Sequence, residues 1–216
     1  MGEVLLKAEK IDKHFGITHA LDHVSITFNK GEIHALIGEN GSGKSTLTSC
    51  LTGIYKKDSG TFILDGKEVS AANQVDGNHQ GVAIIVQEIG TLSGLTVAEN
   101  IFLGNEDQFT KFGIKNTAAM NKKAQEYLDS YGFNYIDAAK TIDDYNFEDR
   151  KLIEIVKSTY FNPKILVVDE TTTALGQKGR EELFKVMHKM RDMGSCVIFI
   201  SHDLEEVIEQ SDQISV

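Results

Sequence analysis

A glycine-rich segment, GENGSGKST at residues 38–46, carries the residue types that hold a phosphate chain. It has the spacing G-x-x-x-x-G-K-[ST] and stands between an apolar run and a helical pattern. Its glycines allow successive backbone N–H groups to turn toward phosphate oxygens, and the following helix adds its positive end. We expect Lys44 to reach the β- and γ-phosphates of a nucleotide and Ser45 to hold Mg²⁺. The residues predicted to bind the nucleotide are Gly38, Asn40, Gly41, Ser42, Gly43, Lys44, Ser45 and Thr46.

Two acidic residues and one histidine lie at the ends of other apolar runs and supply groups suited to phosphoryl transfer. In ILVVDE, we expect Asp169 to complete the Mg²⁺ shell through water and Glu170 to orient or deprotonate the attacking water. His202 follows CVIFI, at the ligand edge of a parallel sheet, and is predicted to contact the γ-phosphate. The other histidines show no metal-ligand spacing. The structural alternatives are a glycine-rich turn and an acidic strand end without a catalytic role.

The strands that position these residues are predicted by apolar periodicity. Short runs rich in Val and Ile are typical of a parallel sheet that is buried on both faces. The segments 25–28 and 60–69 alternate apolar and polar residues between glycines and aspartates, which indicates a small antiparallel sheet. The predicted parallel strands cover residues 33–37, 82–86, 164–168 and 196–200.

Helical patterns fill much of the remaining chain. From about residue 91 to 159 they occur without a strand signal, which predicts a helical subdomain (91–159) inserted in an α/β core (1–90 and 160–216). Amphipathic spacing then predicts which positions face the core. These positions are Leu47, Leu51 and Ile54 after the phosphate loop, Met120, Ala124, Tyr127, Leu128 and Tyr131 in the inserted lobe, and Leu183, Val186, Met187 and Met190 near the end.

The composition limits the partners of the chain. Its 216 residues, 41% hydrophobic and 25% charged, suit a single globular domain with an inserted lobe. A formal net charge of −10 argues against a nucleic-acid partner. Two cysteines in apolar patterns, without a charged-then-apolar leader, predict a reduced, cytoplasmic setting. The longest apolar runs have about five residues, too few to span a bilayer, so any membrane role depends on a partner.

Taken together, the motifs GENGSGKST, IIVQE, ILVVDE and FISHDLEEV resemble those of the ATP-binding domain of ABC transporters, from about residue 4 to the end. The resemblance implies a phosphate-loop NTPase fold of the ABC ATPase type that uses ATP and Mg²⁺. It also implies that Phe15 stacks on adenine and that Gln87 is a catalytic residue and a Mg²⁺ ligand. The groove for a membrane partner's coupling helix is implied near residues 87–103. The alternative for Phe15 is a core position beside the first strand.

Within that family, GENGSGKSTL, TGIYKKDSGT and LTVAENIFLG are most similar to the ATPase subunits of bacterial monosaccharide importers of the ribose, galactose and xylose type. The similarity implies that ATP hydrolysis powers import of a sugar or related small solute through transmembrane permease subunits. The chain would then lie on the cytoplasmic face of the membrane, with a solute-binding protein on the other side. Those subunits usually carry two ATP-binding domains, so we expect this chain to be an N-terminal half whose pairing partner is the second domain.

The segment YNFEDR, residues 145–150, stands where the family has its LSGGQ-like signature. Asn146 can still cap a helix in place of Ser. A carboxylate about 4 Å from a phosphate charge costs roughly 4 kcal/mol at an effective dielectric of 20, so Glu148 must turn away or become protonated when two domains close. Thr171 and Gly176 also depart from the family's Pro and Asp. We therefore expect an asymmetric pair in which one composite site hydrolyses ATP and the other mainly binds it. The degenerate signature positions are Tyr145, Asn146, Phe147 and Glu148.

Two other functions are compatible with parts of this pattern. A regulatory nucleotide-binding module that never hydrolyses is favoured by the degenerate signature, but such a module needs neither Glu170 nor His202. A soluble ABC ATPase that acts on ribosomes or nucleic acid would be expected to carry basic arms, which the −10 balance argues against. The transported solute is not encoded here, because its choice belongs to the membrane and solute-binding subunits.

Overall fold

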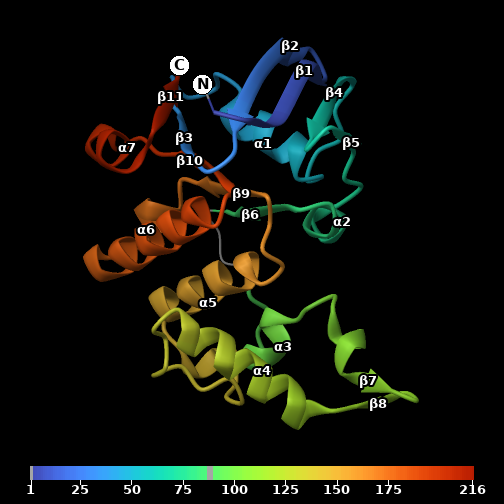
Figure 1. Cartoon of the computed structure of the whole chain (residues 1–216), viewed down its shortest axis with the longest axis vertical. Helices are drawn as coiled ribbons and strands as arrows, with labels where there is room; N and C mark the ends of the chain where they lie inside the picture. The colour runs from blue at the N-terminus through green and yellow to red at the C-terminus, as the bar shows by residue number, and fades with distance from the viewer. Residues whose placement is uncertain (1, 87–89) are drawn as a thin grey trace.

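Parallel strands form the central sheet of the computed structural model, which describes residues 2–86 and 90–216 (Figure 1). They lie in the order β11-β3-β10-β9-β6. Strands β3, β9 and β10 are buried almost throughout, as their unbroken Val and Ile runs predict for a sheet covered on both faces. The predicted parallel sheet is therefore confirmed. Its strands are β3 (Ile33–Leu36), β6 (Val82–Ile85), β9 (Ile165–Asp169), β10 (Cys196–Ile200) and β11 (Gln213–Ser215).

An antiparallel sheet in the order β2-β1-β4-β5 lies beside the N-terminal end of the chain (Figure 1). It confirms the predicted small sheet but begins with a hairpin of two 12-residue strands, longer than the segment the alternation indicated. The hairpin turns at Gly16, whose φ of 59° lies in the left-handed region that glycine adopts readily. The strands are β1 (Val4–Phe15), β2 (Thr18–Asn29), β4 (Ser59–Leu64) and β5 (Lys67–Val69).

One face of the parallel sheet packs against helix α1 (Lys44–Leu51) and the antiparallel sheet. Leu47 and Leu51 join this apolar cluster as predicted. The prediction for Ile54 is wrong: it lies beyond the end of α1 and is exposed, because the chain turns at Gly53, where φ is 79°. The short helix α2 (Gln74–His79) packs beside β6.

The other face of the parallel sheet is covered by α6 (Gln177–Asp192), which lies beside β10 and the C-terminal helix α7 (Leu204–Gln210) (Figure 1). The predicted apolar stripe of α6 is buried, so its two methionines are core residues. Asp203 caps α7 by accepting hydrogen bonds from the backbone N–H groups of Glu205 and Glu206. The buried stripe of α6 is Leu183, Val186, Met187 and Met190.

The inserted subdomain is helical, as predicted, and lies on the side of the core opposite the antiparallel sheet (Figure 1). Met120, Ala124 and Leu128 of its long helix are fully buried, and Tyr127 and Tyr131 pack against the same cluster. A two-stranded ribbon, β7 (Thr110–Lys111) and β8 (Ile114–Lys115), was not expected, because strands of two residues carry no periodicity. The helices of the inserted subdomain are α3 (Val97–Ile101), α4 (Thr117–Ser130) and α5 (Phe147–Thr159), and its 3₁₀ turns are Glu106–Phe109 and Ile142–Asp144. Another 3₁₀ turn, Thr171–Ala174, follows β9 in the core.

Candidate nucleotide-binding site

The phosphate loop joins the end of β3 to the start of α1. Gly38, Gly41 and Gly43 have φ values of 151°, 85° and 94°, a region that favours glycine. A Cβ on Gly43 would also come within 2.8 Å of the carbonyl oxygen of Ala20 on β2, so packing requires a glycine as much as the backbone does. Since α1 begins at the next residue, its unpaired N-terminal N–H groups face the loop.

The ammonium group of Lys44 lies over this loop. Its Nζ donates hydrogen bonds to the carbonyl oxygens of Gly38 and Glu39 at 2.8 and 2.9 Å. Hydrogen bonds from an ammonium to an anionic oxygen are stronger than those to a neutral carbonyl. A phosphate oxygen that enters the loop can therefore replace these carbonyl oxygens as the acceptor of the Lys44 ammonium, without a large movement of the side chain.

Two oxygen groups meet beside the loop although they lie 124 residues apart in the chain. The Ser45 hydroxyl donates to Oδ1 of Asp169 at 3.2 Å, and Asp169 ends strand β9. Burial raises the pKa of the Asp169 carboxyl, while its hydrogen bond to Ser45 opposes that shift. Hydroxyl and carboxylate oxygens are the ligands that Mg²⁺ prefers, so this pair fits the predicted metal.

Glu170 and His202 are brought into contact at the adjacent ends of β9 and β10. His202 Nε2 lies 2.7 Å from Oε1 of Glu170. The contact depends on strand register, because Ile200 of β10 pairs with Asp169 of β9. Glu170 has a φ of 47°, the left-handed region that non-glycine residues adopt rarely and mostly where surrounding structure holds them. A carboxylate positioned by an imidazole next to a phosphate loop is suited to orient or deprotonate a water molecule.

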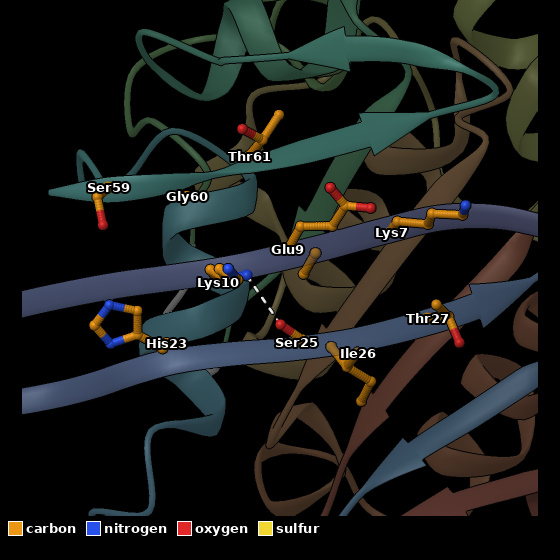
Figure 2. Close-up of a pocket in the computed structure, with 11 residues that line it drawn as sticks. Lys7, Glu9, Lys10, His23, Ser25, Ile26, Thr27, Ser59, Gly60 and Thr61 are labelled. Atoms are coloured by element: carbon orange, nitrogen blue, oxygen red, sulfur yellow. Dashed lines mark hydrogen bonds between the residues drawn. The ribbon is translucent and has the colours of Figure 1, made fainter.

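Two hollows in the surface differ in what they can bind. One of about 430 Å³ runs beside the phosphate loop and is lined by Gly43 and Lys44. A larger one, about 860 Å³, lies on the antiparallel sheet (Figure 2). All of its lining residues come from β1, β2 and β4, and Glu9 lies between Lys7 and Lys10. It offers neither a glycine loop nor a helix N-terminus, so the smaller hollow is the better phosphate site.

The two residues that only the family resemblance implied have different outcomes. Phe15 ends β1 with 42% of its surface exposed, and its ring meets Tyr55 edge-to-face at 5.1 Å. The alternative of a core phenylalanine is therefore wrong. The Lys13 ammonium lies over the ring, 5.2 Å from its centroid. Gln87 lies outside the residues that the structure describes.

A buried ion pair on α5 flanks the segment that contains Gln87, and sequence reasoning missed it. The Lys151 ammonium donates to the carbonyl oxygen of Val86 and lies 3.0 Å from the Glu154 carboxylate. Glu154 in turn accepts a hydrogen bond from the backbone N–H of Gly90 at 3.1 Å. The pair therefore links α5 to Val86 and Gly90. The only signal in the sequence is two opposite charges, three residues apart, on the apolar face of a helix.

The signature segment begins α5, and its partly exposed Glu148 carboxylate points toward α6 of the same chain. Asn146 caps the helix as predicted, accepting from the backbone N–H of Asp149 at 2.9 Å. Oε1 of Glu148 accepts a hydrogen bond from the backbone N–H of Gly179, in the first turn of α6, at 3.1 Å. A Cβ on Gly179 would come within 2.6 Å of that oxygen, so the absence of a side chain makes room for the carboxylate. The Glu148 carboxylate is thus hydrogen-bonded to α6 of its own chain.

The fold and this site define an α/β nucleotide-binding domain of the phosphate-loop class. The chain belongs to the ABC transporter family, whose sequence profile matches residues 21–173. The match contains the phosphate loop, the signature segment and Asp169 with Glu170. The matched range therefore contains most of the site residues, whereas Phe15 and His202 lie outside it.

Curated relatives cover the whole chain but are longer. The chain is 39% identical to a ribose import ATP-binding protein of Clostridium perfringens, over 100% of this chain and 43% of the relative. It is 36% identical to a galactofuranose transporter ATP-binding protein of Escherichia coli, over 98% of this chain and 42% of the relative. The chain thus spans less than half the length of these relatives.

Solved structures share the fold over nearly the entire chain. A nucleotide-free ATP-binding cassette from an ABC transporter superimposes with a TM-score of 0.82 and 28% identity, covering 98% of this chain and 86% of that one. A cassette in its ADP conformation gives a TM-score of 0.80 at 29% identity, with the same coverage. The predicted fold, with a parallel core sheet, an antiparallel sheet and a helical insertion, is confirmed.

Proposed function

We propose that this chain binds ATP with Mg²⁺ and hydrolyses it when paired with a second ATP-binding domain. The observation that carries this proposal is the meeting of three distant segments at one edge of the parallel sheet. Lys44 follows β3, the Asp169 carboxylate at the end of β9 accepts from Ser45, and Glu170 at that same end contacts His202 after β10. A site that only holds a nucleotide needs the loop but has no use for the carboxylate and imidazole pair.

Each residue has a defined task in this proposal. The loop N–H groups and the Lys44 ammonium neutralise the phosphates, which lets an anionic transition state form. Mg²⁺ would be held by Ser45 and Asp169, with Gln87 as the further ligand that the family resemblance implies, and supplies charge neutralisation. Glu170 orients the attacking water and accepts its proton.

The remaining tasks belong to His202 and Phe15. His202 keeps the Glu170 carboxylate in place through the 2.7 Å contact and lies at the sheet edge where a γ-phosphate is expected. The exposed Phe15 ring supplies a face for adenine.

We further propose that the hydrolysis powers import of a monosaccharide or a related small solute. The support is the identity to proteins named for ribose import and galactofuranose transport. Among residues 2–86 and 90–216 no helix has the length and apolar composition needed to cross a membrane. The proposal includes permease subunits that contact the chain near residues 87–103, where the family resemblance implies the groove, at the cytoplasmic face of the membrane. A solute-binding protein contributes indirectly.

We also propose that the two ATP sites of the complete protein are unequal. Glu148 replaces the glycine that the family places against the partner's γ-phosphate, and its carboxylate is bonded to α6 of its own chain. This chain's phosphate loop, with Glu170 and His202, would form the hydrolytic site together with the signature of the second domain. The site completed by Glu148 would mainly bind ATP.

ATP binding is tested first with the purified chain, by titration with a fluorescent ATP analogue in the presence of Mg²⁺. We expect Lys44→Ala to weaken binding about ten- to a hundredfold, since it removes a charge-assisted bond worth about 1.5–3 kcal/mol. Lys122→Ala is the matched control, because Lys122 is exposed and its substitution removes the same charge at a site far from the loop. Equal affinity of both variants and the wild-type chain would rule out the phosphate-loop site.

Hydrolysis is tested by the ATPase rate as a function of chain concentration, alone and in the full-length protein. The isolated chain is expected to show a negligible rate at every concentration, because pairs of this chain have two defective signatures. In the full-length protein, Glu170→Gln should abolish turnover but leave ATP binding intact. A full-length rate that Glu170→Gln does not change would favour the non-hydrolysing regulatory module instead.

A further inference from the structure

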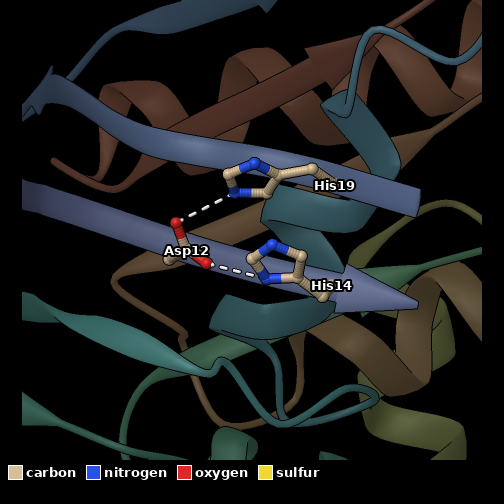
Figure 3. A group of neighbouring side chains, drawn as sticks. All are labelled: Asp12, His14 and His19. Atoms are coloured by element: carbon tan, nitrogen blue, oxygen red, sulfur yellow. Dashed lines mark hydrogen bonds and ion pairs between the residues drawn. The ribbon is translucent and has the colours of Figure 1, made fainter. Parts of the chain in front are cut away.

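A cluster of histidines and one carboxylate lies on the β1–β2 hairpin, outside the nucleotide site (Figure 3). Asp12 and His14 belong to β1, and His19 belongs to β2, which pairs with it across the hairpin. His14 Nδ1 lies 3.1 Å from Oδ1 of Asp12, and His19 Nε2 lies 3.0 Å from Oδ2. One atom of each residue can be chosen so that all lie within 4.8 Å of one another.

The carboxylate at the centre of this cluster is buried but has imidazoles as its charge partners. Asp12 has only 7% of its surface exposed. Within the described residues, no lysine or arginine forms an ion pair with it, and the neighbouring Lys13 pairs with Asp58 instead. The cluster therefore places a carboxylate and two imidazoles, groups that bind transition-metal ions, around one point.

The separations of the donor atoms can be compared with those of a tetrahedral metal site. With metal–ligand distances of about 2.0–2.2 Å, neighbouring ligand atoms in such a site lie about 3.4 Å apart. His14 and His19 contact different oxygens of Asp12, at 3.1 and 3.0 Å, and one ligand atom from each of the three residues can be chosen within 4.8 Å of the others. Binding through a single Asp12 oxygen therefore requires a movement of about 1 Å by at least one side chain. The rings of His14 and His19 are about half to a third exposed and lie against each other at 3.9 Å, so both can tilt toward a common point.

The protonation of the imidazoles is compatible with metal binding. In the metal-free hairpin, His19 Nε2 donates a hydrogen bond to Oδ2 of Asp12, and His14 Nδ1 lies beside Oδ1. A ring whose hydrogen lies on its other nitrogen presents a lone pair to the centre of the cluster. Coordinate bonds to the metal would then replace the His19–Asp12 hydrogen bond and the His14–Asp12 contact.

We propose that Asp12, His14 and His19 bind one divalent transition-metal ion of the zinc type. Two imidazole nitrogens and a carboxylate suit Zn²⁺, Co²⁺ or Ni²⁺, whereas Mg²⁺ prefers oxygen ligands. The site is thus chemically different from the Mg²⁺ site at Ser45 and Asp169. Its fourth position faces solvent, where a water molecule or His23, whose Nδ1 lies 3.4 Å from Oδ2 of Asp12, can complete the shell. The ion would cross-link the two strands next to Phe15.

The test is a Zn²⁺ titration of the purified chain, without a histidine tag, by isothermal calorimetry in a buffer that does not bind zinc. The variant His14→Ala/His19→Ala is expected to lose one bound Zn²⁺ or to bind it at least about tenfold more weakly. The control is His79→Ala/His188→Ala, which removes the same number of histidines from α2 and α6 and should bind as the wild type does. Asp12→Asn should reproduce the loss with both rings retained.

Two further measurements keep the proposal decidable. Thermal melting identifies any variant that fails to fold. If Asp12→Asn unfolds, the zinc titration of His14→Ala/His19→Ala still tests the proposal, because these two side chains are partly exposed. X-ray absorption at the zinc edge should show imidazole scattering that His14→Ala/His19→Ala removes. The proposal is overturned if this variant binds Zn²⁺ with unchanged number and affinity, or if Glu170→Gln alone removes all binding, which would assign the ion to the Glu170 and His202 pair.

Discussion

The backbone N–H of Gly179 donates a hydrogen bond to Glu148, which lies 31 positions away in the chain. The effect on stability of a methyl group added at Gly179 should therefore depend on Glu148. The perturbation is Gly179→Ala, made in the wild-type chain and in Glu148→Ala. The added Cβ would lie 2.6 Å from Oε1 of Glu148, which is shorter than van der Waals contact, so the carboxylate must leave its place. The same Cβ meets the Leu175 side chain at 3.0 Å in both backgrounds, and that term cancels from the comparison.

The expected magnitude follows from two opposing terms. Alanine in place of glycine in a helix raises the free energy of unfolding by about 1 kcal/mol. Loss of the hydrogen bond to the partly exposed Glu148 carboxylate lowers it by about 1.5 kcal/mol, the lower end of the range for a charged partner. Gly179→Ala should therefore lower the free energy of unfolding of the wild-type chain. Its effect on the free energy of unfolding of Glu148→Ala should be more positive by about 1.5 kcal/mol, because no hydrogen bond is lost there.

The assay is a double-mutant cycle by thermal or urea unfolding. For a domain of this size, about 1.5 kcal/mol corresponds to a difference of roughly 3–6 °C in Tm. Gly176→Ala is the matched control, because its Cβ would lie 3.4 Å from the same Glu148 oxygen and need not displace it. If Gly179→Ala shifts Tm equally in both backgrounds, Glu148 does not lie at the start of α6 and the explanation of the signature segment is wrong.

Three further predictions concern other parts of the molecule. Glu148→Gly should let the isolated chain hydrolyse ATP at a rate that rises with the square of its concentration, measured by phosphate release, because it removes a repulsion of roughly 4 kcal/mol per charge pair; a rate as low as the wild type's would contradict this. Lys151→Met leaves Glu154 buried without its ammonium and should lower the free energy of unfolding by about 3 kcal/mol in urea, and adding Glu154→Gln should restore part of the loss. Burial raises the pKa of the Cys50 thiol to about 11 and also raises that of Cys196, so neither should react with a thiol reagent at pH 8 until the chain unfolds; rapid labelling of the native chain would place one of them at the surface.

Local sequence patterns were sufficient to predict those features that form within one segment of the chain. The phosphate loop, its helix and the runs that form β3, β6, β9 and β10 were predicted from spacing alone, because backbone geometry and burial act over a few residues. The helix cap at Asn146 was predicted for the same reason. The error at Ile54 has a local cause as well: the helical stripe was extended past the point where Gly53 ends it.

The sequence by itself therefore determined the class of protein, the phosphate-binding loop and the identities of the groups available for hydrolysis. Only the tertiary structure decided where those groups point, because contacts between distant segments depend on strand register and on which helices share a face. The turn of Glu148 toward α6 and the contact between Glu170 and His202 are of this kind. So is the Asp12 cluster: its histidines show no metal-ligand spacing along the chain, and they meet because antiparallel pairing brings β1 and β2 together across a two-residue turn.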